Sequence, residues 1–101
     1  MNGKISKNRI KNTKALHQKK YRDAAGAFLV EGVKPVGEAL AADAKIEMIA
    51  YRGDVADFPY PLPETALSVS PAEMERMTAL KTPSPILAVC RKPQMKTNLD
   101  F

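Results

Sequence analysis

Short and almost wholly apolar runs recur along the chain, and segments long enough to form helices separate them. The runs cover residues 27–30, 46–51, 66–69 and 86–90. Runs of this length between Gly, Pro and polar residues are typical of buried strands. Strands that alternate with helices predict an α/β fold: a small αβα sandwich with a mostly parallel sheet of about four strands.

A long helix is expected before the first strand. Ser6 is suited to cap it, no Pro or Gly interrupts the stretch up to Ala25, and Gly26 is suited to end it. At 100° per residue its apolar stripe spans only about 80° of arc. The stripe consists of Ile10, Thr13, His17, Tyr21 and Ala24. So narrow a stripe predicts weak docking, with His17 a packed and hydrogen-bonded helix residue.

Two further helices follow from spacing and capping signals. Apolar residues at helical spacing predict a helix over residues 33–41. The tetrad Ser70-Pro71-Ala72-Glu73 supplies an N-cap, a first-turn proline and a capping-box glutamate. The helix that it begins is expected to bury Met74, Met77 and Leu80. The proline-rich residues 52–64 are expected to form an irregular loop.

Positive charge is concentrated at the amino terminus. The first 22 residues hold eight bases and no acid, whereas the other 79 hold eight bases and all eleven acids. A basic arm on a slightly acidic body favours a polyanionic partner, nucleic acid first and anionic lipid second. The alternative is a lysine-rich helix that is merely solvated.

Signatures of catalysis are missing. Gly32 and Gly37 have the spacing of a phosphate-binding P-loop, but Glu38 and Ala39 stand where that motif needs Lys and Ser or Thr. The single Cys90 lies in an apolar run and fits a buried side chain in a reducing cytoplasm. We therefore expect no catalytic residue, no metal site, no membrane partner and a cytoplasmic location.

Two blocks of the sequence resemble a known family. The first is Arg22-Asp23-Ala24-Ala25-Gly26-Ala27-Phe28-Leu29-Val30-Glu31-Gly32, followed by Val36 and Glu38-Ala39-Leu40. It resembles a signature of the substrate-binding domain that precedes the catalytic half of SpoU-type (TrmH-like) RNA 2′-O-ribose methyltransferases. The second block, residues 77–89, resembles the family's M-x-x-L-x-T-P turn and the I-L-A-V strand after it.

The resemblance implies a fold shared with small ribosomal and kink-turn-binding proteins. It also implies a domain that presents structured ribosomal or transfer RNA to a separate catalytic domain. S-adenosylmethionine is expected in that absent domain, which usually supplies a homodimer, and no cofactor is expected in this chain. We expect the RNA-binding domain at residues 1–93 and a linker or tail at 94–101. The alternative is a stand-alone, non-enzymatic RNA-binding or ribosome-associated protein.

RNA contacts are expected on the basic arm and at the turn after the first strand. Helix amides and the helix dipole converge at Glu31-Gly32, where a phosphate fits. In the opposing interpretation Gly32 serves only the fold and Glu31 pairs with Arg22. Partly exposed Tyr51, Phe58 and Tyr60 would form a thin stacking platform, which favours recognition by shape and phosphate. The predicted RNA-binding residues are Lys4, Lys7, Arg9, Lys11, Lys14, Lys19, Lys20, Arg22, Gly32, Lys34 and Lys81.

Overall fold

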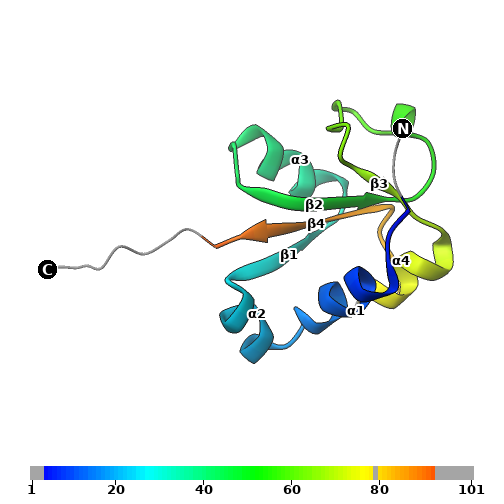
Figure 1. The fold of residues 1–101 in the computed structure, drawn as a ribbon. Helices are drawn as coiled ribbons and strands as arrows, with labels where there is room; N and C mark the ends of the chain where they lie inside the picture. The colour runs from blue at the N-terminus through cyan, green and yellow to red at the C-terminus, as the bar shows by residue number, and fades with distance from the viewer. Residues whose placement is uncertain (1–3, 79, 93–101) are drawn as a thin grey trace, which may run out of the picture.

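A four-stranded sheet with helices on both faces makes up the structure (Figure 1), a computed structural model that describes residues 4–78 and 80–92. The strands are β1 (Ala27–Glu31), β2 (Ile46–Tyr51), β3 (Leu67–Ser68) and β4 (Ile86–Arg91). The helices are α1 (Lys7–Ala15), α2 (Lys19–Ala25), α3 (Val33–Ala41) and α4 (Pro71–Met77), with a 3₁₀ turn η1 at Val55–Asp57. The expected α/β sandwich of about four strands is confirmed. The expected tail at 94–101 lies outside the described residues.

The sheet is mixed, so the expectation of a mostly parallel sheet was wrong. The strand order is β1-β4-β2-β3, and β4 runs antiparallel to both of its neighbours. Only β2 and β3 pair in parallel. The crossover through α3 leaves a gap between β1 and β2, and the last strand of the chain fills it. The carboxyl ends of β1, β2 and β3 therefore meet at one edge, where β4 begins; we call this the carboxyl edge.

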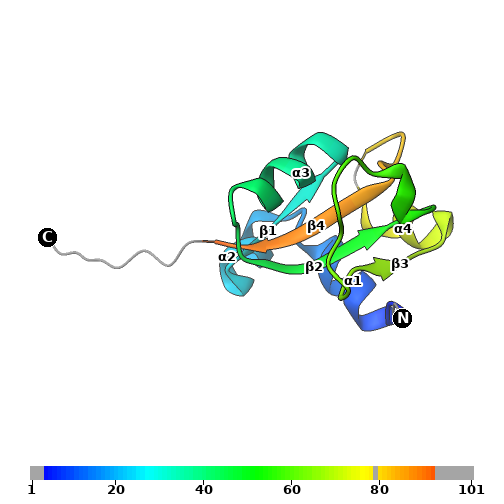
Figure 2. The same ribbon diagram turned by 90° about the horizontal axis from the view of Figure 1, so that it is seen from above.

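Alternate residues of the strands build one hydrophobic core on each face of the sheet. Leu87 and Val89 of β4 belong to the core beneath α1 and α4, whereas Ile86, Ala88 and Cys90 belong to the core beneath α3. Figure 2 shows α3 lying across β1 and β4, and Figure 1 shows α1, α2 and α4 on the opposite face. Cys90 is buried, as expected.

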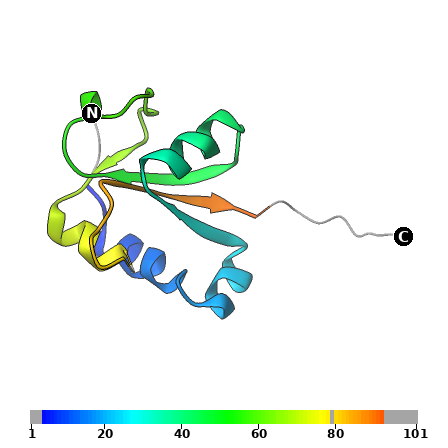
Figure 3. The same ribbon diagram turned by 180° about the vertical axis from the view of Figure 1, so that it is seen from behind.

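The helix expected over residues 7–25 is two helices, α1 and α2, separated by residues 16–18 (Figure 3). Leu16 is buried, and Gln18 has an extended backbone that interrupts helical hydrogen bonding. The Arg22 guanidinium donates to the carbonyl oxygens of Leu16 and His17 at 3.1 and 3.0 Å, which satisfies carbonyls left open where α1 ends. No Pro or Gly marks this break, which coincides with the burial of Leu16 and the contact of His17 with the carbonyl oxygen of Met77.

Capping predicts the other helix boundaries correctly, with one error. Ser70 and Glu73 form the expected capping box of α4, and Gly26 ends α2 in the left-handed conformation with φ 64°. Met74 and Met77 are fully buried. Leu80 is 48% exposed, against expectation, because α4 ends at Met77 and Thr78 continues in an extended conformation.

Candidate nucleic-acid interface

Helix α1 buries a narrow face and leaves its cations in solvent. Ile10 and Thr13 are its buried residues, and the Arg9 amide donates to the Ser6 hydroxyl at the amino-terminal cap. The predicted RNA-binding residues of this segment are all exposed: Lys4, Lys7, Arg9, Lys11 and Lys14. None of the ion pairs within residues 4–78 and 80–92 involves them. Their charge can therefore meet phosphates without first breaking an ion pair.

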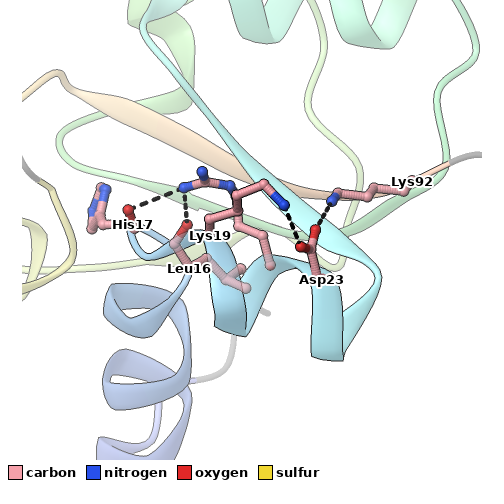
Figure 4. A network of polar contacts seen from close by, with 6 residues as sticks. Leu16, His17, Lys19, Asp23 and Lys92 are labelled. Atoms are coloured by element: carbon pink, nitrogen blue, oxygen red, sulfur yellow. Dashed lines mark hydrogen bonds and ion pairs between the residues drawn. The ribbon is translucent and has the colours of Figure 1, made fainter.

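Helix α2 carries an acid that neutralises part of its charge (Figure 4). Lys19 Nζ lies 2.7 Å from one carboxylate oxygen of Asp23, and Lys92 Nζ lies 2.8 Å from the other. The hydrogen bonds from Lys19 and from Lys92 lower the pKa of Asp23 from 3.8 to about 2. Predicted RNA-binding Lys19 thus already has an anionic partner.

The other two cations of α2 also contact protein groups. Arg22 is partly buried and donates to two backbone carbonyls, so it stabilises the break between the helices. Glu31 does not pair with it. Lys20 Nζ lies 4.9 Å from the centroid of the Tyr21 ring, a cation–π contact.

The turn after β1 lies at the carboxyl edge and is stabilised by contacts within the protein. The Gly32 amide donates to the Ile86 carbonyl at 2.9 Å, so it already has an acceptor within the fold. Gly32 has φ 111°, and a Cβ there would lie 3.2 Å from Pro35 Cδ. The amides of Val33 and Lys34 stand in the first turn of α3, where helical acceptors are lacking, and Lys34 is exposed.

Thr78 connects the basic helix to this turn. Its hydroxyl donates to the Glu31 carboxylate, and it lines a hollow of about 550 Å³ together with Lys11 and Lys14. His17 lies beside it, with Nε2 2.7 Å from the carbonyl oxygen of Met77, so the expected hydrogen bond is confirmed. The residue lies in the break between α1 and α2, however, and not in a helix as expected. The cations of α1 and the turn after β1 therefore border a shared surface.

The segment after Thr78 returns to the same turn. A Cβ on Gly32 would lie 3.9 Å from Ser84 Oγ, and predicted RNA-binding Lys81 is exposed three residues earlier. Ser84 therefore lies beside the turn that Lys34 follows, although the two segments are distant in the sequence.

Two of the three aromatic residues expected to be partly exposed near the proline-rich loop, Tyr51 and Phe58, are buried, whereas Tyr60 is half-buried. Tyr51 and Phe58 are 4% and 8% exposed and pack edge to face, with ring centroids 6.1 Å apart. Tyr60 stacks on Phe58 and donates to the Val33 carbonyl, and burial raises the pKa of its hydroxyl. Among residues 4–78 and 80–92, the aromatic residue that is exposed is Tyr21, at 43%. Sequence reasoning placed Tyr21 on the buried stripe of one continuous helix, and the break at residues 16–18 invalidates that placement.

Other kinds of site find no support in the part of the chain that the structure describes. Among those residues, no three His, Cys, Asp or Glu side chains gather in a way that could hold a metal ion. No described helix is both long enough and apolar enough to cross a membrane. Burial raises the pKa of the Cys90 thiol, which makes it a poor nucleophile.

Comparison with protein families finds one match that covers most of the sequence. The model of the MRM3-like substrate binding domain matches residues 7–88. Comparison with curated protein sequences finds no match.

Solved structures of methyltransferases share the fold. A protein from Porphyromonas gingivalis assigned to the TrmH family of RNA methyltransferases superposes with a TM-score of 0.77 at 27% identity, over 96% of this chain and 39% of that one. An AdoMet-bound rRNA methyltransferase from Sinorhizobium meliloti gives 0.67 at 22% identity, over 92% and 37%. The SpoU methyltransferase AviRb from Streptomyces viridochromogenes, in complex with AdoMet, gives 0.68 at 20% identity, over 88% and 34%. The chain thus spans about two fifths or less of these proteins.

Proposed function

Because the chain belongs to the family of MRM3-like substrate binding domains, we propose that it binds structured RNA for a SpoU/TrmH-type 2′-O-ribose methyltransferase. The RNA is ribosomal or transfer RNA, and the chain presents it to a separate catalytic domain. The chain covers 39% or less of each of the three solved methyltransferases described above, which supports a separate domain of that kind.

The observation that carries the proposal is the exposed and unpaired set of cations on α1, which borders the turn after β1 through Thr78. The Thr78 hydroxyl is bonded to Glu31 and shares a hollow with Lys11 and Lys14. Phosphate contacts supply most of the affinity of RNA-binding proteins and fix the position of the RNA. We add exposed Lys34, in the first turn of α3 at the carboxyl edge, and exposed Lys81, three residues before Ser84, to the proposed surface.

We place S-adenosylmethionine in the separate catalytic domain, where it would donate the methyl group to the ribose. The AdoMet complexes of two neighbouring structures support this assignment. In the described part of the chain no glycine lines any of the main hollows, which favours a cofactor site outside them. We further propose that residues 1–93 form the RNA-binding domain, that 94–101 lead toward the catalytic domain, and that the catalytic domain supplies a homodimer.

Binding of labelled total transfer RNA and of fragmented ribosomal RNA to the 101-residue chain tests the RNA assignment. The double variant Lys11→Glu/Lys14→Glu should lose at least tenfold in affinity at low salt, because two cations become two anions beside the phosphates. The matched control Lys45→Glu changes an exposed lysine at the opposite edge of the sheet, where β2 begins. Equal losses per reversed charge in the two variants would show attraction by net charge alone and would contradict the proposed surface.

Calorimetry with S-adenosylmethionine tests the assignment of the cofactor to a separate domain. The isolated chain should give no heat of binding, and it should transfer no methyl group to either RNA. Saturable cofactor binding by this chain would refute the assignment of the cofactor to a separate domain.

A further inference from the structure

A groove of about 650 Å³ lies between α1, α2 and the sheet, and none of the assignments above uses it. Its volume is within the range of small-molecule sites, about 300–1,000 Å³. It is lined by Asn8, Arg9, Asn12, Tyr21, Ala24 and Ala25, with Leu16, Ala27 and Val89 among the deeper apolar residues.

The geometry points to an unpaired nucleobase as the occupant: we propose that a base of the bound RNA enters this groove and stacks on Tyr21. The inference rests on the proposed function and adds a base-binding site to a surface otherwise defined by phosphate contacts. Proteins that read single-stranded RNA typically stack splayed bases on exposed aromatic side chains.

The break between α1 and α2 creates the groove. If the helix continued through residues 16–18, no second helix segment would form the opposite wall. Small side chains keep the space open, because Ala24, Ala25 and Ala27 line it where larger residues would fill it. The groove is therefore a direct result of the contacts that Arg22 and Leu16 make at the break.

The lining offers the groups that a base requires. Tyr21 is 43% exposed and lines both this groove and the neighbouring hollow that holds Lys11 and Lys14. Asn8 and Asn12, one helical turn apart, each carry an amide donor and an amide acceptor, which suit the hydrogen-bonding edge of a base.

Charge favours RNA over a protein segment as the occupant. Arg9 lines the groove, and Lys11 and Lys14 line the adjoining hollow. The one acid in the lining is Glu47, whose carboxylate lies 2.8 Å from Arg91 Nε and is therefore paired. A cationic rim around an apolar floor complements a base attached to its phosphates.

The test compares two RNAs with the full chain: a hairpin with 2-aminopurine in its unpaired loop, and a duplex of equal length without unpaired nucleotides. Tyr21→Ala should weaken hairpin binding by ~5- to 150-fold, the range expected for loss of one stacked base. Duplex affinity and the salt dependence of both complexes should stay unchanged, since no charge is removed. The fluorescence quenching that stacking causes in the wild-type complex should disappear.

Two control variants separate stacking from structural damage. Tyr21→Phe keeps the ring and should keep both affinity and quenching. Val55→Ala removes a side chain of similar exposure, 45%, in the loop that carries η1 and should change nothing. Thermal unfolding of each variant checks the fold.

Three outcomes would overturn the inference. If Tyr21→Ala leaves hairpin binding unchanged, or weakens hairpin and duplex equally, the groove does not hold a base, although RNA binding itself stands. If Tyr21→Ala instead changes the sedimentation of the protein alone, the groove contacts a second copy. If the wild-type chain binds neither RNA, the proposed function falls together with the inference.

Discussion

Helices α1 and α2 are similarly basic in sequence but differ in the charge that they present to a partner. The cations of α1, Lys7, Arg9, Lys11 and Lys14, are exposed and make none of the ion pairs of the described residues. On α2, Lys19 is paired with Asp23, Arg22 is bonded to carbonyls, and Lys20 lies against Tyr21. Formal charge along a sequence therefore overstates the charge that RNA can use.

The difference has two local causes. Asp23 follows Lys19 by four residues, a spacing that brings both side chains to the same side of a helix, whereas α1 contains no acid. The backbone leaves the helical conformation at residues 16–18, which exposes carbonyls that Arg22 then satisfies. The basic residues of α2 thus mainly stabilise the fold, and we infer that those of α1 bind the RNA.

The largest expected effect is on the salt dependence of RNA binding. Replacing Lys7, Arg9, Lys11 and Lys14 with Ala should reduce the slope of log K against log salt by about 3, since each phosphate contact contributes ~0.7–0.9. Replacing Lys19 and Lys20 with Ala should reduce it by less than ~1, because Lys19 is already paired. Titrations at four salt concentrations measure both slopes. If the slope fell equally per cation removed in the two helices, α1 and α2 would not differ in the charge that they present to RNA.

Arg22 should matter for stability rather than for binding. Arg22→Met keeps much of the aliphatic side chain but removes the donor to the carbonyls of Leu16 and His17, which should cost about 1–3 kcal/mol of unfolding free energy. Lys20→Met is the matched control on α2 and should stay within about 0.5 kcal/mol. Urea unfolding measures both. A stable Arg22→Met variant with a reduced salt slope would instead make Arg22 a phosphate contact.

A smaller effect is expected at the carboxyl edge. Lys34→Ala should lower RNA affinity severalfold at low salt and change stability by no more than about 0.5 kcal/mol, because the side chain is exposed. Lys45→Ala, at the opposite edge, is the control for a general loss of charge. Amide chemical shifts of residues 31–34 that stay constant during an RNA titration would assign this turn to the fold alone.

The sequence predicts well those features that local signals determine. Capping residues locate α4 and the end of α2, and apolar runs locate β1, β2 and β4 almost to the residue. The position of β4 between β1 and β2 has no local signal, since strand order depends on which gap the last strand fills. Alternation of strands and helices alone therefore predicted the wrong pairing directions.

The candidate site shows the same division. The exposed cations of α1 and Lys34 follow from helical spacing and were predicted. The break at residues 16–18 coincides with contacts between residues that are distant in the sequence, such as His17 with Met77. No local sequence signal therefore predicts it. The exposure of Tyr21 depends on this break, and so does the groove beside it.

The smallest expected effect is that of removing the charge of Asp23. Without this acid, α2 should resemble α1 in the positive charge that it presents to RNA. The pKa of Asp23 is about 2 in the folded chain and 3.8 without its partners, so the ion pairs stabilise the fold above pH ~4. That contribution is lost as the pH falls from ~4 toward 2, because protonation then occurs in both states. The melting temperature of Asp23→Asn should therefore lie slightly below that of wild type at pH 6 and coincide with it near pH 2. Both ion pairs are exposed, so the gap at pH 6 should also shrink in high salt.

The same substitution releases Lys19 and Lys92, of which Lys19 is a predicted RNA contact. It should raise the salt slope of RNA binding by up to about 1 at neutral pH, the value of one added phosphate contact by Lys19. A lower melting temperature without a steeper slope would mean that α2 faces away from the RNA, and the comparison between the two helices would then rest on position rather than on ion pairing.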